Sequence, residues 1–344
     1  MQAPEMTAPR ANIYAVAERA GVSIATVSRV QRGIGPVSTE MRERVEQAIN
    51  ELGYSPSPTG RALAGQRLDA IGIVFPDLAG PYYSAVLLGA EAASVAAGSS
   101  LLILATHGRP QAEALVRDLS AKVDGLIVMG RTVGDDAVRA LAQRVPLVLL
   151  AREPIGELPA VRSANREPAQ RLVAHLIEVH GHTRLSFIGD PGASSDAEDR
   201  WQGFLDAHRA LGVPAPPAAF AAPFDENGGR AAAGTALDQE PPPTALVCAS
   251  DEIAIGAYAA VHERGLRPGT DIAITGWDDI QLARFVTPPL TTVRQPMDRL
   301  GRIAAELLAQ RVAGEPAESQ TLPSDLVVRA SCGCTPRTHR EVVQ

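Results

Sequence analysis

The feature that constrains the fold most is a repeating change of pattern that starts near residue 69. Short runs of aliphatic residues alternate there with alanine-rich segments of helical periodicity. This alternation predicts parallel sheets with helices on both faces, because a helix must return the chain between parallel strands. The expected strands are 70–75, 101–105, 125–129, 146–150, 184–189, 245–249 and 271–277, and the expected helices include 84–97, 110–120, 168–179 and 252–264.

The number of expected strands favours two doubly wound sheets over one, and hence an α/β region made of two lobes. We expect the chain to pass from one lobe to the other near residues 162–166. That stretch lies between the fourth expected strand and a helix opening at Glu167 and Pro168.

Residues 12–53 differ from the rest, because they show only short helical patterns with capping residues at their starts. Asn12, Ser23 and Ser38 precede expected helices at Ile13–Arg19, Ile24–Gln31 and Thr39–Leu52, and the third helix stops at Gly53. The following residues 54–68 hold two prolines and two glycines, which is typical of a linker.

The first two of these helices have the pattern of a helix-turn-helix. Gly21 suits the positive-φ position of a short junction, and the residues after Ser23 leave an outward face. Such a face can enter a DNA major groove, where Arg29 can donate two hydrogen bonds to guanine and Ile24 or Ala25 can contact a thymine methyl. The alternative for the bare pattern is an αα-corner in a helical cap.

Segment 15–30 resembles the helix-turn-helix of the LacI/GalR family of transcriptional regulators, with Ala15 in place of the usual Asp. Segment 37–58 is similar to the family's third helix and hinge entry, and the resemblance extends over about residues 12–334. It implies a small all-α helix-turn-helix head at 10–55, a hinge at 56–67, and a periplasmic-binding-protein-like α/β core of two doubly wound parallel-sheet lobes at 68–335. The expected N-lobe is 68–163 and 293–320, and the expected C-lobe is 164–292 and 321–335.

The resemblance also implies how DNA is bound. A homodimer would read a palindromic double-stranded operator with a central C–G step, and Leu63 would wedge into its minor groove from a hinge helix. Gly60 stands where the family usually has Ala, so we expect a free hinge with little helix. The alternative is that Leu63 only closes the start of the next domain. The expected DNA-contacting residues are Ser23, Ile24, Ala25, Thr26, Ser28, Arg29, Arg61 and Leu63.

A small-molecule effector is implied between the two lobes. Two departures from the family, Ala151-Arg152 for Asp-Arg and Ser250-Asp251 for Asn-Asp, remove hydroxyl-recognising groups. They leave a sugar, a sugar phosphate or a nucleoside open as the effector, while loop packing and solvated salt bridges are the structural alternatives for these residues. The expected effector-binding residues are Tyr82, Tyr83, Arg152, Arg200, Phe224, Ser250, Asp278 and Gln295.

No constellation for catalysis is visible, and we expect no enzyme, no cofactor and no metal site. His180 and His182 lack companion ligands in the sequence, and we interpret Cys332-Gly-Cys334 as a structural end segment rather than a metal site. The alternative function is a sugar-binding protein without a role on DNA, which the helix-turn-helix pattern disfavours.

The charge is unevenly distributed along the chain. The formal net charge is −7, but residues 1–66 carry seven Arg and six Glu, so the remaining residues are at −8. DNA contact is therefore expected only at the head. Three cysteines, no signal-peptide pattern and no long apolar run favour a soluble cytoplasmic protein that does not enter a membrane.

Overall fold

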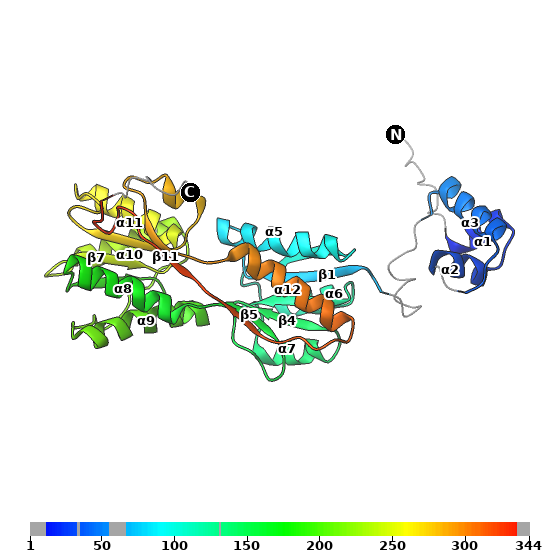
Figure 1. Cartoon of the computed structure of the whole chain (residues 1–344), viewed down its shortest axis with the longest axis horizontal. Coiled ribbons are helices and arrows are strands. Elements are labelled where there is room, and N and C mark those ends of the chain that lie inside the picture. The colour runs from blue at the N-terminus through cyan, green and yellow to red at the C-terminus, as the bar shows by residue number, and fades with distance from the viewer. Residues whose placement is uncertain (1–11, 33–34, 55–66, 131, 336–344) are drawn as a thin grey trace, which may run out of the picture. The chain divides into compact units, whose positions relative to one another are not determined.

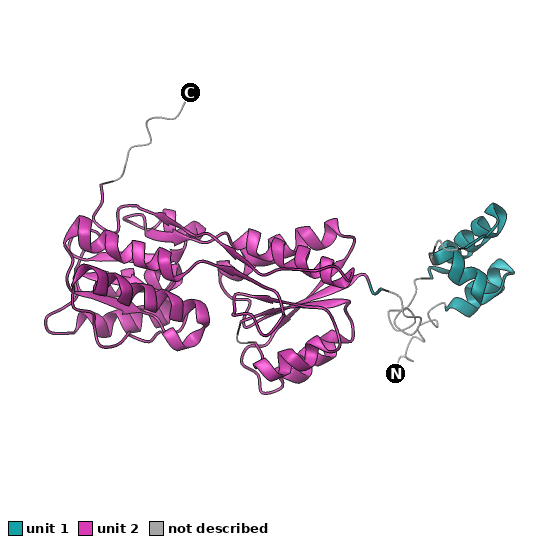
Figure 2. Ribbon diagram, turned by 60° about the horizontal axis from the view of Figure 1, so that its bottom comes forward, with its two compact units in different colours: residues 1–68 teal, residues 69–344 magenta. Residues whose placement is uncertain are grey.

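The structure is a computed structural model that describes residues 12–32, 35–54, 67–130 and 132–335. The chain divides into two compact units, Met1–Leu68 and Asp69–Gln344 (Figure 2). The division falls just after the expected hinge. Each unit is described by itself.

The first unit contains three helices, α1 (Ile13–Ala20), α2 (Ile24–Arg32) and α3 (Thr39–Leu52). Their starts follow from local capping: the Asn12 side chain accepts a hydrogen bond from the Ala15 amide at 3.0 Å, and Ser38 accepts one from the Met41 amide at 3.3 Å. Apolar side chains on all three helices form the core of this unit, with Val16, Val27 and Val45 completely buried.

Gly21 makes the junction between α1 and α2. Its φ of 65° lies in the left-handed region, where glycine is favoured, and the next amide, that of Val22, donates to the Ala17 carbonyl at 3.0 Å. Arg44 on α3 donates to the Ala20 and Gly21 carbonyls, which secures the turn from the third helix. The predicted helix-turn-helix geometry is therefore present.

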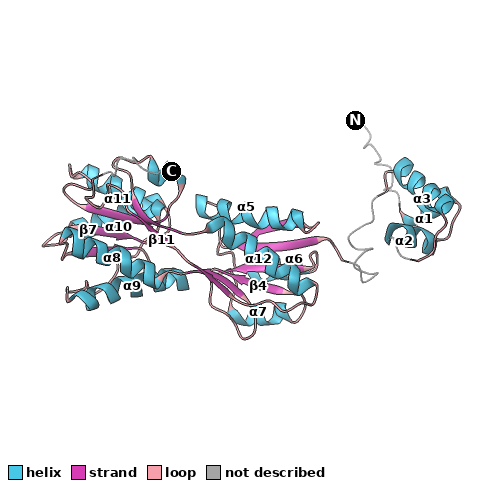
Figure 3. Ribbon diagram, viewed as in Figure 1, coloured by secondary structure: helices cyan, strands magenta, loops and turns pink. Residues whose placement is uncertain are grey.

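The second unit has two lobes, each an α/β sandwich (Figures 1 and 3). The N-lobe sheet is entirely parallel, with the order β10-β5-β4-β3-β1-β2. One face is covered by α5 and α12 and the other by α6 and α7. The N-lobe elements are β1 (Ala70–Phe75), α5 (Pro81–Ala96), β2 (Ser100–Ala105), α6 (Ala112–Ser120), β3 (Gly125–Met129), α7 (Asp135–Ala142), β4 (Leu147–Leu150), β5 (Ala160–Ser163), α12 (Met297–Val312) and β10 (Gln320–Leu322).

The C-lobe sheet has the order β11-β9-β8-β7-β6, and only its edge strand β11 is antiparallel. Helices α8 and α9 pack together on one face, and α10 and α11 pack together on the other. The C-lobe elements are α8 (Arg166–His180), β6 (Leu185–Ile188), the 3₁₀ turn η1 (Pro191–Ala193), α9 (Ser195–Leu211), α10 (Glu226–Leu237), β7 (Ala245–Cys248), α11 (Asp251–Glu263), β8 (Ala273–Asp278), the 3₁₀ turn η2 (Gln281–Arg284), β9 (Thr291–Arg294) and β11 (Asp325–Val327).

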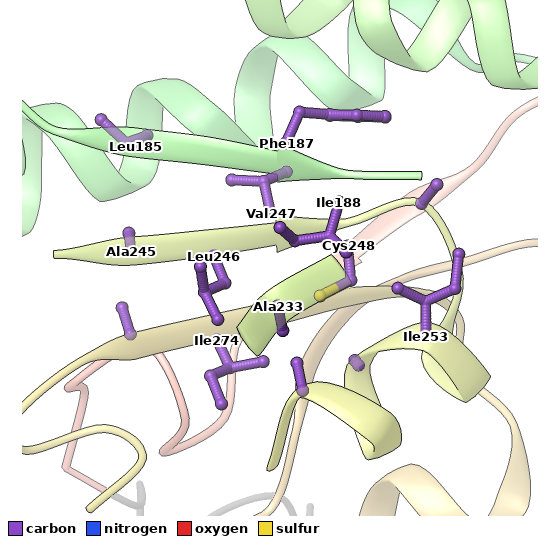
Figure 4. Close-up of a cluster of buried hydrophobic side chains, with 14 of the residues drawn as sticks. Leu185, Phe187, Ile188, Ala233, Ala245, Leu246, Val247, Cys248, Ile253 and Ile274 are labelled. Atoms are coloured by element: carbon purple, nitrogen blue, oxygen red, sulfur yellow. The ribbon is translucent and has the colours of Figure 1, made fainter. Parts of the chain in front are cut away.

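Continuous apolar runs explain why β7, β8 and even the edge strand β6 of the C-lobe sheet are buried on both faces. Figure 4 shows Leu185 and Phe187 of β6 and Ala245 to Cys248 of β7 within the C-lobe core, against Ile274 of β8. Burial of both faces is what a parallel sheet between two helical layers requires. Because both faces are buried, these strands do not alternate between apolar and polar residues.

The chain passes between the lobes three times: after β5, after β9 and after β10. The first passage, between Ser163 and Arg166, lies where the sequence predicted it. The other two differ slightly from the expected lobe boundaries, because β9 stays in the C-lobe sheet through Arg294 and β10 stays in the N-lobe sheet through Leu322. The expected fold class, a helix-turn-helix head with a two-lobed α/β core, is confirmed.

Candidate functional site

The outward side of α2 carries most of the side chains expected to contact DNA. Ser23, Ile24, Ala25 and Arg29 are exposed, and Thr26 and Ser28 are half-buried. The Ser23 hydroxyl accepts a hydrogen bond from the Thr26 amide at 3.2 Å, so it caps the helix as expected. Ile24 is 40% exposed although it is apolar, which leaves it available to a thymine methyl. Arg61 and Leu63 lie outside the described residues.

A cavity of about 210 Å³ lies between the two lobes, at the carboxyl ends of strands from both sheets. This is where open α/β sheets bind ligands. Its N-lobe wall consists of Pro76, Ala79, Tyr82, Tyr83, Met129, Gly130 and Ala151, and its C-lobe wall consists of Ala193, Ser194, Asp196, Arg200, Phe224, Glu252 and Asp278.

Arg200, on α9, is the one basic side chain among these lining residues, and the protein fixes it in place. Its Nε donates to Asn165 Oδ1 at 2.9 Å and its Nη1 donates to the Ala249 carbonyl at 2.6 Å. The guanidinium also lies over the Trp277 ring, 4.6 Å from the centroid. A planar group held in this way can present its remaining donors to a ligand without a large entropic cost.

Three carboxyl groups line the cavity together with Arg200, and burial raises the pKa of each. Burial raises the pKa of Asp278 to about 6, although the charge of Arg200 and a hydrogen bond from Gln295 oppose the rise. Burial and the charge of Asp278 raise the pKa of Glu252 to about 7, and burial also raises the pKa of Asp196. A ligand that donates hydrogen bonds to these carboxyl groups would therefore stabilise their ionised form.

Aromatic side chains supply the apolar part of the cavity wall. Tyr82 and Tyr83, at the start of α5, meet edge to face with centroids 5.5 Å apart, and Phe75 of β1 packs on Tyr83 in the same manner. Phe224 enters from the C-lobe and is 37% exposed. Together with the carboxyl groups, these rings give the cavity a wall that is partly apolar and partly hydrogen-bond accepting.

Five of the eight expected effector residues line the cavity, and Arg152, Ser250 and Gln295 do not. Arg152 turns away and donates to Asp135 at 2.6 Å, in a separate surface depression beside α7. Ser250 caps α11 by accepting from the Ile253 amide at 3.2 Å. Gln295 lies behind Asp278, to which it donates at 2.5 Å.

Asp196 and Glu252 are cavity residues that the sequence reasoning did not select. Both lie in the first turn of a helix, α9 and α11, two residues after the capping serines Ser194 and Ser250. An acidic residue in a first helical turn is usually explained by the helix dipole. The signal that marks these two is their position beside the carboxyl ends of strands, which only the assembled sheet reveals.

The expectation that His180 lacks companion ligands was wrong. The structure brings His175 and His180 of α8 against the thiols of Cys332 and Cys334, so that one donor atom from each lies within 4.8 Å of the others. The companions come from about 150 positions further along the chain, which is why local spacing did not reveal them. His182 is not part of this cluster, and its ring bonds Thr244 at 3.0 Å.

A three-helix head and a two-lobed core with a cavity at the strand ends define a class, the bacterial regulators that join a DNA-binding domain to a periplasmic-binding-protein-like domain. The model of bacterial regulatory proteins of the lacI family matches residues 12–57, and that of the periplasmic binding protein-like domain matches residues 173–332. The chain belongs to the LacI family of transcriptional regulators.

Curated relatives match nearly the full chain. The HTH-type transcriptional repressor CytR of Escherichia coli (strain K12) is 34% identical over 328 residues, covering 93% of this chain and 96% of that protein. The ribose operon repressor of the same strain is 33% identical over 314 residues, covering 89% and 94%.

Solved structures agree with this assignment. A lac repressor dimer bound to operator and the anti-inducer ONPF has a TM-score of 0.82 at 29% identity, covering 94% of this chain and 99% of that one. A LacI family regulator from Enterococcus faecium with bound ribose has a TM-score of 0.70 at 25% identity, covering 76% and 98%. Within the described part of this chain, no helix has the length and apolar character needed to cross a membrane.

Proposed function

We propose that this protein is a repressor that binds a two-fold symmetric operator as a homodimer, and that a neutral, hydroxyl-rich small molecule in the cavity between the lobes changes its affinity for DNA. The observation that carries the effector proposal is the set of charges around the cavity. Among the described residues that line the cavity, three carry carboxyl groups, Asp196, Glu252 and Asp278, and one, Arg200, carries a guanidinium.

This imbalance of charge favours a sugar or nucleoside over a sugar phosphate. A phosphate carries negative charge and would meet more carboxylate than guanidinium, in a site where burial already disfavours negative charge. Arg152 would have offset this imbalance, but its guanidinium pairs with Asp135 outside the cavity. Sugar phosphates should therefore bind more weakly than the corresponding free sugars.

Hydroxyl groups match the hydrogen-bond requirements of the cavity. Asp196 and Asp278 both line the cavity, and their carboxyl groups can accept hydrogen bonds from a ligand. Vicinal hydroxyls of a sugar could donate to both. The ribose operon repressor and the ribose-bound regulator among the relatives support a pentose or a pentose-containing nucleoside.

The link from ligand to DNA is proposed to pass through the segments that join the lobes. Gln295, at the second passage, donates to Asp278 and accepts a hydrogen bond from Ser163, which ends β5 at the first passage. A ligand that replaced Gln295 as the hydrogen-bond donor to Asp278 would therefore disturb two of the three segments that join the lobes. Such a ligand can change DNA affinity only if it prefers one arrangement of the lobes.

The homodimer is supported by symmetry and by exposed apolar side chains. Two half-sites of a palindromic operator need two heads. Leu88 and Val95, two turns apart on α5, are 69% and 61% exposed, and Ile103 on the edge strand β2 is also exposed. Since α5 packs against β2, these residues offer one apolar surface for a second copy. The lac repressor relative was solved as a dimer on operator DNA.

The test is calorimetric titration of the full chain with ribose, ribonucleosides and ribose 5-phosphate. We expect a neutral compound to bind, and expect Arg200→Ala and Asp278→Asn to weaken it at least tenfold. Arg152→Ala is the matched control, since it removes an arginine that the structure places outside the cavity, and it should bind normally. Tighter binding of the phosphate, or weakening by Arg152→Ala alone, would contradict the proposed effector class.

A further inference from the structure

We propose that His175, His180, Cys332 and Cys334 form a four-coordinate zinc site that fastens the C-terminal segment to the end of α8. The site lies in the C-lobe and is independent of the cavity between the lobes. Its four donor atoms come from two segments, the last turns of α8 and the residues that follow β11.

The distances between donor atoms agree with tetrahedral coordination. Zinc bonds of about 2.3 Å to sulfur and about 2.0–2.1 Å to nitrogen, at tetrahedral angles, place a sulfur and a nitrogen ligand about 3.6 Å apart. His175 Nε2 lies 3.6 Å from the sulfur atoms of both Cys332 and Cys334. His180 Nε2 lies 3.3 Å from the Cys334 sulfur. The other three pairs of donor atoms also lie within 4.8 Å, so the four ligands are already gathered around one point.

The types and spacing of the ligands are those of structural zinc sites. Two imidazoles and two thiolates complete the coordination of the ion and leave no position open, which fits a structural role rather than a catalytic one. His175 and His180 are separated by four residues, which is within the usual range for a histidine pair. Their rings are inclined at 77°, so neither imidazole stacks on the other.

The residue between the two cysteines is suited to this arrangement. Gly333 has φ 99°, and a Cβ atom there would lie 3.3 Å from Nδ1 of His180. Glycine therefore permits both thiols to turn toward the histidines without crowding the imidazole. This explains the short Cys-Gly-Cys spacing.

A second layer of hydrogen bonds holds the buried sulfur. The Thr291 hydroxyl donates to the Cys332 sulfur at 3.2 Å, and the Arg329 amide donates to the Thr291 hydroxyl at 2.8 Å. Hydrogen bonds of this kind orient the ligands of metal sites and favour the thiolate.

The metal should strengthen the fold without being required for it. Ser331, next to the cluster, already joins the segment to the sheet: its hydroxyl donates to the Ile274 carbonyl at 2.6 Å and accepts from the Thr291 amide at 2.8 Å. Variants that lose the metal should therefore still fold. Their C-terminal segment should open more readily and their melting temperature should fall.

The experiment measures zinc in the untagged full chain, purified under reducing conditions without chelator. We expect about one zinc ion per chain, as a closed four-ligand site predicts. Cys334→Ser and His180→Asn, both at half-buried positions, should lose most of this zinc. A chelator should lower the melting temperature of the wild type but not that of Cys334→Ser. Matched controls are His182→Asn and Cys248→Ala, which remove a histidine and a cysteine outside the cluster and should retain zinc.

Cobalt substitution gives a readout that does not depend on how the variants fold. The wild type loaded with Co²⁺ should show the intense visible bands of a tetrahedral ion and a sulfur-to-metal charge-transfer band. The proposal is overturned if the wild type takes up neither metal. It is also overturned if its mass shows the loss of two thiol hydrogens to a Cys332–Cys334 disulfide, or if Cys334→Ser holds as much zinc as the wild type.

Discussion

Asp278 shows how a single residue in this core is positioned for binding. Its backbone φ is 112°, and that of Asp279 is 55°, both in the region that favours glycine. The Asp279 carboxylate holds this turn in place, because Arg294 and Arg329 pair with it at 2.7 and 2.5 Å and Arg284 lies at 3.5 Å. The unusual backbone thus directs the carboxyl group of Asp278 toward the cavity.

The raised pKa of Asp278 predicts that effector affinity depends on pH. Burial holds that pKa at about 6 instead of 3.8, so the folded protein binds the proton more tightly than the unfolded chain does. This contribution to stability is present below pH 3.8 and is lost as the pH rises through about 6. A ligand hydroxyl that donates a hydrogen bond to Asp278 needs this side chain in its ionised form. With a pKa of about 6, only about one tenth of the Asp278 side chains are ionised at pH 5.

We therefore expect effector affinity to fall about tenfold between pH 7 and pH 5, measured by calorimetry. Asp278→Asn should bind weakly with a flatter pH profile, and any remaining slope should come from Glu252 and Asp196, whose pKa values burial also raises. An affinity in the wild type that rises toward pH 5 would contradict the carboxylate's role.

Arg29 carries the second residue-scale prediction. Its side chain is exposed on α2, where it can donate two hydrogen bonds to a guanine. Arg29→Ala should cost about 1–3 kcal/mol per half-site and relax the preference at the contacted base pair, measured by competition binding to operator variants. Arg42→Ala on α3 is a charge-matched control. A uniform loss of affinity across all sequences would assign Arg29 to a phosphate instead.

At the level of elements, the sequence predicted what local chemistry controls. The capping residues lie where they were expected: Asn12 and Ser38 begin their helices, and Gly53 ends one. Each of them acts on amides or carbonyls within a few residues. Strands with long apolar runs were predicted, but the buried strands β5 and β9, whose sequences AVRS and TTVR include polar residues, were not. Short edge strands such as β10 and β11 were not, since only pairing with distant β5 and β9 makes them strands.

The candidate site was predicted less completely than the fold. Side chains at strand ends could be chosen from the sequence, but not the direction in which each one points. Arg152 shows this: an ion pair with Asp135, formed only in the folded lobe, draws it out of the cavity. The histidine–cysteine cluster depends on a contact between α8 and a segment more than 150 residues away.

The contact between α5 and α12 allows an element-scale prediction. A Cβ atom at Gly89 would lie 1.8 Å from the Asp298 carbonyl oxygen, and one at Gly301 would lie 1.9 Å from that of Val86. Either Gly→Ala change must therefore separate the helices, and we expect a loss of about 1–3 kcal/mol in unfolding free energy. Gly234→Ala, in a helix with only an arginine side chain nearby at 3.4 Å, should be neutral or stabilising. Denaturant titration distinguishes these outcomes, and equal stability of Gly89→Ala and wild type would refute the close contact.

The charge distribution of the whole chain bears on how it binds DNA. The first 66 residues are nearly neutral, and the remainder carries a charge of −8, so general attraction to DNA is weak. We therefore propose that specific binding comes from two heads acting at once, which would make it depend on the dimer.

Leu88→Glu tests this dependence, because a carboxylate on the exposed apolar surface of α5 would have to be buried between two copies. We expect sedimentation to show a monomer and operator affinity to fall at least tenfold. Val179→Glu, at a similarly exposed position on α8, should remain a dimer. If Leu88→Glu still sediments as a dimer with full affinity, the subunit contact lies elsewhere.

Regulated binding to a palindromic operator is tested most directly by selecting binding sites from random double-stranded DNA with the full chain, and repeating the selection with the effector identified by calorimetry. We expect enrichment of one palindrome with a central C–G step, loss of that enrichment in Arg29→Ala, and an altered affinity for the selected site when the effector is added. Enrichment of no sequence, or an affinity for the selected site that no cavity ligand changes, would contradict regulated operator binding.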